Sequence, residues 1–292
     1  MVDSGCKSEF AKLLKVDRTC LYRTWTKQQE KDEISSRELI EAHIENPRYG
    51  VERLAIVLTW SEDKTRRIRN ITGVKALQRT KRSYRKKNVQ EIDAPENKLR
   101  NLWELRDSER PWLGYDFTEL TNPELRIWAQ DFTYIPWRGK FLYFAATLRL
   151  ATREVIGWSF SSYHDAELVC NSLEDALRKH SAPDIIHTDQ GSEYLSQKNY
   201  DLCKGIDSIM SASDPGEPWQ NGFMERFFNT FKEEMAGRIK RCGTIAEVYE
   251  RIADWVYYYN NQRIHTALKM APAAYAKKLS TKKKEPKKKV LA

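Results

Sequence analysis

The sequence predicts an α/β fold in which a mixed sheet carries flanking helices, preceded by an all-α N-terminal region. Up to residue 71, apolar side chains recur at helical spacing, and from residue 126 onward strand-like runs alternate with amphipathic helices. At 292 residues, the chain is too long for one minimal domain. The expected divisions are a helical region at 1–90, a linker at 91–125, an α/β domain at 126–276 and a basic tail at 277–292.

The N-terminal region is expected to consist of short helices. Apolar stripes predict two helices within 8–25, joined by a turn near Val16–Asp17. A further helix is expected at 36–44, where the segment NPRYG ends it, and the next at 51–58.

The basic residues are concentrated in two places. Fifty Lys and Arg against 41 Asp and Glu give a net charge of +9, which favours a polyanionic partner. Residues 64–87 hold eleven Lys or Arg and no acidic residue, and residues 282–289 hold six Lys and one Glu. Ser61 is expected to cap a basic helix at 63–71, and a compact helix, a turn and a basic helix are typical of a helix-turn-helix DNA reader. A plain helical hairpin and a solvated tail are the alternative interpretations.

From residue 126 the composition shifts to the aromatic and β-branched residues that favour strands. Three consecutive runs separated by short turns predict an antiparallel meander, after which helices and strands alternate. The strands are expected at 126–135, 140–150, 153–160, 184–189 and 207–213, and the helices at 165–180, 193–204, 221–238 and 244–260.

Neither a zinc motif nor a membrane segment is recognisable in the sequence. The five cysteines are far apart, with no CxxC pair and no histidines at zinc-ligand spacing. No run of 18 apolar residues occurs, and the start lacks the pattern of a signal peptide. A cytoplasmic protein with free thiols is therefore expected.

Three acidic residues fall in segments that aim them at a common point. Asp131 lies within a strand-like run, Asp189 ends another, and Glu225 lies near the start of a helix. Strands disfavour Asp, and burying its charge unpaired costs several kcal/mol, so a functional role is favoured for Asp131. Asp189 is equally well explained as a turn cap, and Glu225 alone as a surface residue.

Carboxylates at close range repel, and a bound divalent cation is the usual relief. Mg²⁺ prefers oxygen ligands, and a pair of such ions serves phosphoryl transfer. Asn221, Glu225 and Lys232 share one helix face, which places Lys232 where it can contact phosphate near the metals.

Taken together, the motifs point to a family. They are WAQDFTYI, REVIGW, HTDQGSEY, ERFFNTFKEE and YYNNQRIHTALKMAPAAY, with thirty-five residues (190–224) between the second acid and the third. Over about 35–276 the chain resembles the transposases of bacterial insertion sequences whose catalytic domain is close to retroviral integrase. The resemblance implies a ribonuclease-H-like fold and an Asp-Asp-Glu catalytic triad of Asp131, Asp189 and Glu225.

By this resemblance the triad binds two Mg²⁺ ions, with Mn²⁺ as a substitute. Water cleaves a phosphodiester at the element's end, and the freed 3′-OH then attacks the target strand. The expected partners are double-stranded DNA, further copies of the chain in a synaptic complex and a co-encoded upstream subunit, and the expected location is the bacterial nucleoid. The residues expected to contact DNA are Lys232, Asn221, Arg66, Arg67, Arg69, Lys81, Arg82, Arg263 and His265.

Two positions depart from the family pattern. Arg149 replaces a usual Asp in the second strand, and Gln220 with Asn221 replaces an Asp-Asn pair before the last acid. A catalytically inactive DNA-binding regulator and another integrase-like recombinase are therefore kept as alternatives. Retroviral integrase itself is disfavoured, because the first hundred residues lack its zinc module of two His and two Cys.

Overall fold

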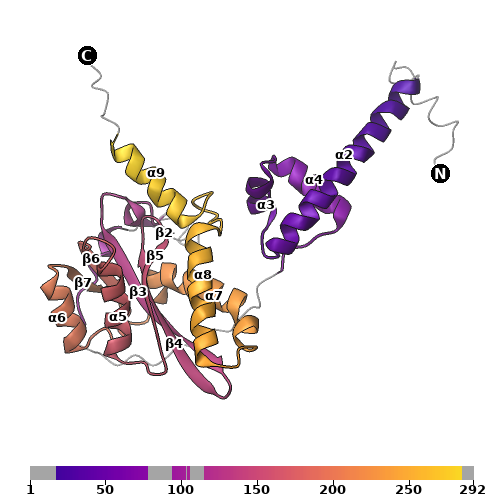
Figure 1. Cartoon of the computed structure of the whole chain (residues 1–292). Coiled ribbons are helices and arrows are strands. Elements are labelled where there is room, and N and C mark those ends of the chain that lie inside the picture. The colour runs from indigo at the N-terminus through magenta and orange to yellow at the C-terminus, as the bar shows by residue number, and fades with distance from the viewer. Residues whose placement is uncertain (1–17, 78–93, 103, 106–114, 285–292) are drawn as a thin grey trace, which may run out of the picture. The chain divides into compact units, whose positions relative to one another are not determined.

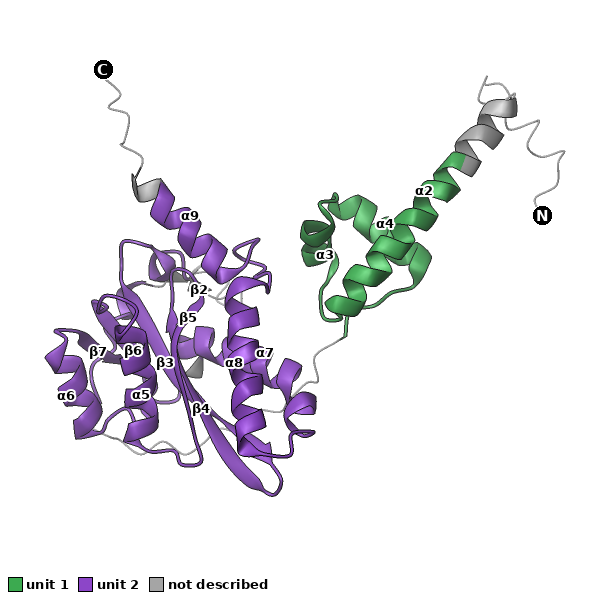
Figure 2. Ribbon diagram, viewed as in Figure 1, with its two compact units in different colours: residues 1–81 green, residues 82–292 purple. Residues whose placement is uncertain are grey.

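The computed structural model describes residues 18–77, 94–102, 104–105 and 115–284. The chain separates into two compact units between residues 81 and 82, coloured differently in Figure 2. The turn expected near Val16–Asp17 lies outside the described residues, as do Lys81 and Arg82. No helix in the described ranges is long and apolar enough to cross a membrane.

The first unit is helical, as predicted, but one expected break is absent. Helix α2 runs unbroken over Arg18–Glu45, where separate helices at 8–25 and 36–44 were expected. The intervening residues contain neither Pro nor Gly, and pairs one turn apart support the helix, with Gln28 donating to Asp32 at 2.7 Å.

Two shorter helices complete this unit: α3 (Val51–Leu58) and α4 (Glu62–Thr72). The predicted cap of α4 is confirmed, because the Ser61 hydroxyl accepts from the Lys64 backbone amide at 3.2 Å. One fully buried side chain from each helix, Leu39, Leu54 and Ile68, supplies the core.

The second unit is built on a five-stranded mixed sheet, visible in Figure 1. Its strands are β3 (Ile127–Trp137), β4 (Lys140–Arg149), β5 (Glu154–Ser161), β6 (Ile185–Thr188) and β7 (Ile209–Ala212). The spatial order is β5-β4-β3-β6-β7. The first three form the predicted antiparallel meander, and β3–β6 and β6–β7 pair in parallel. The predicted mixed sheet with flanking helices is confirmed.

Helices pack on both faces of this sheet. The smaller core, containing Trp128, Leu173 and Cys203, joins the sheet to α5 (Ala166–Leu177) and α6 (Gln197–Gly205). The larger core joins the sheet to α7 (Gly222–Ile239) and α8 (Ile245–Asn261). Since side chains alternate along a strand, Ile127, Ala129 and Asp131 point toward the α7 face.

Two further segments complete the second unit. The stretch expected as a linker carries η1 (Arg100–Leu102), a short pair β1 (Glu104–Leu105) and β2 (Tyr115–Asp116), and η3 (Glu119–Thr121). Its Leu99 and Leu120 are buried in the larger core, so this stretch is part of the fold of the unit. Where a basic tail was expected to begin, helix α9 spans Pro272–Lys284.

Candidate active site

The sheet topology places Asp131 and Asp189 on adjacent strands. In the parallel pairing of β3 with β6, Ile127 lies opposite Ile185 and Ala129 opposite His187. Continued by two residues, the same register sets Asp131 opposite Asp189, which directly follows β6. Two carboxylates therefore meet where β6 ends.

Asp189 also caps a turn, as its sequence neighbourhood allowed. Its Oδ1 accepts from the Gly191 amide at 2.9 Å, so the carboxylate is held at the end of β6. A Cβ atom on Gly191 would lie only 3.0 Å from that oxygen and 3.2 Å from Glu193 Oε2, which explains why a glycine suits this position.

Helix α7 is positioned by aromatic packing. Phe227, Phe228 and Phe231 surround Phe144 of β4, with ring centroids 4.9–6.2 Å apart. Because this face of the helix is buried, Glu225 lies on the exposed side of its first turn. The double phenylalanine of the sequence thus fixes the rotation of the helix that carries the third acid.

The three predicted carboxylates and Lys232 interact electrostatically, as the pKa of Asp131 indicates. Burial raises the pKa of Asp131 well above its usual value, and the charges of Asp189 and Glu225 raise it further. The Phe132 amide, which donates to Asp131 Oδ1 at 2.8 Å, and the Lys232 ammonium act in the opposite direction on this pKa. Lys232 Nζ lies 4.5 Å from the centre of the Tyr134 ring.

Three oxygen donors of this kind are chemically suited to a hard divalent cation. Within the described residues, however, no three His, Cys, Asp or Glu side chains stand close enough together to hold a metal ion. Asp131 is held by strand pairing and Asp189 by its turn, whereas Glu225 is an exposed side chain on a helix. Glu225 is therefore the member whose side chain would have to move inward.

Three residues beside the acids were missed by sequence reasoning. His164 Nδ1 lies 2.8 Å from Glu193 Oε1, and its ring stacks at 6.2 Å on Phe132, the neighbour of Asp131. Tyr194 is fully buried, and the charges of Asp131 and Asp189 add to burial in raising its pKa. The only sequence signal was the position of Glu193 and Tyr194 shortly after Asp189.

The residues expected to contact DNA in the first unit are largely exposed cations on α4. Arg66 pairs with Asp63 at 2.8 Å and Arg67 with Asp32 at 2.5 Å, while Arg69 donates to a backbone carbonyl. Arg66 and Arg69 also line a cavity of about 550 Å³.

In the second unit, Asn221 is buried and Arg263 is half-buried. Arg263 is only 11% exposed and pairs with Glu234 at 3.0 Å, an arrangement that favours a structural role joining α8 to α7. Asn221 is 7% exposed and donates to the Gln130 carbonyl at 3.3 Å. His265 pairs with Met270 through the backbone in a short bridge.

The remaining residues singled out in the sequence have structural partners. Arg149 lies opposite Trp128, three residues before Asp131 on β3, and contacts Glu154 and His180. His187 is buried between Ser211 and Ser213, and burial lowers its pKa to about 4, so it is neutral. Trp255 and Tyr259 belong to the core, as expected.

Comparison with known proteins agrees with this architecture. Residues 122–218 and 207–272 match models of the integrase core domain. The chain is 30% identical over 254 residues to the transposase for insertion sequence element IS904 of Lactococcus lactis, covering 85% of this chain and 95% of that protein. It is also 30% identical to the putative transposase InsK for insertion sequence element IS150 of Escherichia coli, over 56% of this chain and 58% of that protein.

Among solved structures, the catalytic core of HTLV-2 integrase in complex with magnesium is similar, with a TM-score of 0.42 and 17% identity. This match covers 51% of this chain and 95% of that one. By its family matches and its sheet order, the second unit is an integrase core with a ribonuclease-H-like fold. The chain belongs to the transposases of bacterial insertion sequences, and it is a DNA transposase.

Proposed function

We propose that Asp131, Asp189 and Glu225 are the catalytic carboxylates of this transposase and would hold Mg²⁺, with Mn²⁺ as a substitute. The observation that carries the proposal is the β3–β6 register, which sets Asp131 opposite Asp189. Burial and the neighbouring carboxylates raise the pKa of Asp131, and such a set is relieved by a divalent cation. Two bound ions would activate the attacking oxygen and stabilise the leaving oxygen of a phosphodiester.

The protein's own groups would position the DNA strand. Lys232 lies near Asp131 and carries a charge suited to a phosphate beside the reacting one. In the first step, water attacks phosphorus at the element's end and the bond to the 3′ oxygen breaks, leaving a 3′-OH. In the second step, that hydroxyl attacks a target phosphodiester and displaces its 3′ oxygen.

The first unit is proposed to bind the element's end. Arg66, Arg69 and Lys75 line one cavity, and α4 presents its arginines after a capped first turn, as a helix-turn-helix recognition helix would. Because two element ends must be joined, a homo-oligomeric synaptic complex is expected, and a co-encoded upstream subunit remains part of the proposal.

The test is strand cleavage of element-end DNA with Mg²⁺. Asp131→Asn, Asp189→Asn and Glu225→Gln are each expected to abolish cleavage while leaving DNA binding intact. Glu250→Gln, an exposed glutamate on α8, is the matched control and should cleave like the wild type. Retained cleavage in any triad variant would contradict the assignment, and binding without nicking by the wild type would favour the regulator.

A further inference from the structure

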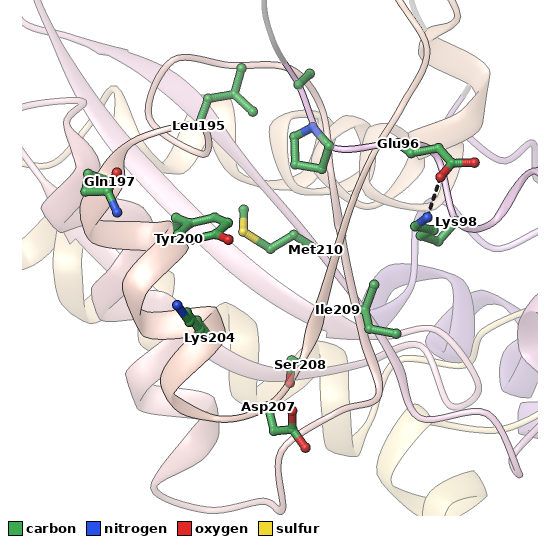
Figure 3. Close-up of a pocket in the computed structure, with 12 residues that line it drawn as sticks. Glu96, Lys98, Leu195, Gln197, Tyr200, Lys204, Asp207, Ser208, Ile209 and Met210 are labelled. Atoms are coloured by element: carbon green, nitrogen blue, oxygen red, sulfur yellow. Dashed lines mark hydrogen bonds and ion pairs between the residues drawn. The ribbon is translucent and has the colours of Figure 1, made fainter.

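Residues 94–102 form a strap that crosses the edge of the sheet. The strap and helix α6 border a cavity of about 680 Å³ beside β7. In Figure 3, Glu96 and Lys98 of the strap, which form an ion pair, lie on the other side of Met210 from Tyr200 and Lys204 of α6. Beyond this cavity the strap reaches the loop that leads into α7.

Four side chains fasten the strap to that loop, and we call them the clasp: Asn97, Arg100, Asp214 and Gln220. Gln220 Oε1 accepts from Asn97 Nδ2 at 2.8 Å and from the Asp214 amide at 2.6 Å. Gln220 Nε2 donates to Asp214 Oδ2 at 2.9 Å, and Arg100 donates to Asp214 Oδ1 at 2.6 Å. Asn97 and Gln220 are each 5% exposed, so the bond between them is shielded from water, whereas the Arg100–Asp214 pair lies nearer the surface.

The clasp lies between the elements that deliver the acids. Asn221, which follows Gln220, donates to the carbonyl of Gln130, the residue before Asp131. Helix α7 begins at the next residue, and Glu225 lies in its first turn. The clasp is thus one residue from a direct link between the loop and β3.

The strap is also bonded to the strands that carry Asp189. The Lys98 amide donates to Ser211 Oγ of β7 at 3.0 Å, and Ser211 Oγ lies 2.9 Å from His187 Nδ1 of β6. Asp189 follows two residues after His187. Residues 94–102 therefore contact both the loop that leads into α7 and the strand next to β6, which precedes Asp189.

We propose that the clasp positions the loop 214–221 and thereby sets Glu225 against Asp131 and Asp189, with Gln220 as its central positioning residue. This inference rests on the proposed role of Glu225. The loop contains Gly216 in the left-handed region (φ 79°), and its only regular structure is the four-residue η4 (Pro218–Asn221). Side-chain bonds are therefore needed to hold it, and an error of about 1 Å in a catalytic group costs on the order of 100-fold in rate.

The chemistry of the clasp allows an isosteric exchange. Gln220→Glu keeps the two acceptor bonds but sets a carboxylate oxygen against Asp214 Oδ2, where an amide donated. Asp214→Asn alone sets an amide group between two donors, Gln220 Nε2 and Arg100. The double variant restores every bond, because the amide nitrogen introduced at position 214 donates to the new carboxylate while the amide oxygen accepts from Arg100.

The first measurement is hydrogen exchange without DNA or metal. The backbone amides of Asp214, of 216–217 and of 219–222 are expected to exchange faster in each single variant, and at the wild-type rate in the double variant. Gln197→Glu is the matched control, because Gln197 donates to Asp201 at 2.8 Å on the exposed face of α6, outside the clasp. Unchanged exchange in Gln220→Glu would overturn the clasp, whatever the catalytic function.

The second measurement is single-turnover cleavage of element-end DNA. Each single variant should lose about tenfold or more in the cleavage rate constant, as expected for a charged hydrogen bond, with unchanged DNA affinity. The double variant should recover it. Faster exchange with an unaltered cleavage rate would overturn the positioning role, and an inactive wild type with the expected exchange pattern would contradict only the proposed function.

Discussion

Replacing the half-buried carboxylate of Asp131 by an amide is expected to stabilise the metal-free protein while abolishing cleavage. Asp131→Asn keeps the shape of the side chain, and its amide oxygen still accepts the 2.8 Å bond from the Phe132 amide. What disappears is the repulsion between Asp131 and the charges of Asp189 and Glu225. The cost of desolvating a carboxylate disappears as well.

The size of the effect follows from the strand register. Groups on neighbouring strands are about 5 Å apart, and two like charges at that separation repel by about 3 kcal/mol at an effective dielectric constant of 20. The attraction of Lys232 offsets part of this repulsion. A gain of about 1–3 kcal/mol in the free energy of unfolding is therefore expected, or roughly 2–10 °C in melting temperature for a unit of this size.

The assay is urea and thermal unfolding at pH 7.5 in EDTA, repeated with Mg²⁺. The variant should unfold later than the wild type in EDTA, and Mg²⁺ should stabilise the wild type more than the variant. Asp254→Asn, an exposed carboxylate on α8, is the control and should change stability by less than about 0.5 kcal/mol. A variant no more stable than the wild type in EDTA would refute the idea that these carboxylates repel one another.

Three further predictions concern the supporting fold. Gly157→Ala should destabilise the second unit by about 3 kcal/mol in urea unfolding, because the added Cβ would lie 2.5 Å from the backbone nitrogen of Ala176, which has no room to yield. A change below about 1 kcal/mol would show that β5 and α5 are not in such close contact. Ser61→Ala should cost about 1 kcal/mol in the melting of the helical unit, measured by circular dichroism, whereas Ser61→Gly should cost only a few tenths, and equal costs would argue against the cap. Burial, followed by the charge of Arg149, lowers the pKa of His180 below 6.5, so the unfolded chain takes up a proton there more readily than the folded chain. The contribution of His180 to the free energy of unfolding is therefore fully present above pH 6.5 and falls as the pH is lowered through 6.5. His180→Gln should lose less stability than the wild type between pH 7.5 and 5.5, and equal losses in the two proteins would contradict this reasoning.

The strands were predicted to within about two residues, and β3, β4 and β5 are aromatic and β-branched runs bounded by turns. The placement of Asp131 and Asp189 followed once two such runs were taken as neighbours. Helix α2 was misread because its middle segment is polar on all sides, which leaves no periodic signal although nothing breaks the helix. The pairing of His164 with Glu193 has no signal either, since 28 residues (165–192) separate the two.

Gln220 illustrates what a residue-by-residue comparison with a family pattern leaves out. A carboxylate at position 220 would face Asp214 Oδ2, and the two acids would repel in a part-buried place. The other oxygen of Asp214 already accepts from Arg100. An amide instead accepts from Asn97 and donates to Asp214 with a single side chain. Asn97 lies more than a hundred residues away in sequence, and the compatibility of these groups is set by donor and acceptor geometry. The choice of Gln at position 220 is therefore coupled to Asn97 and Asp214. The loop 214–221 is held by a different set of hydrogen bonds, and its support has not been lost.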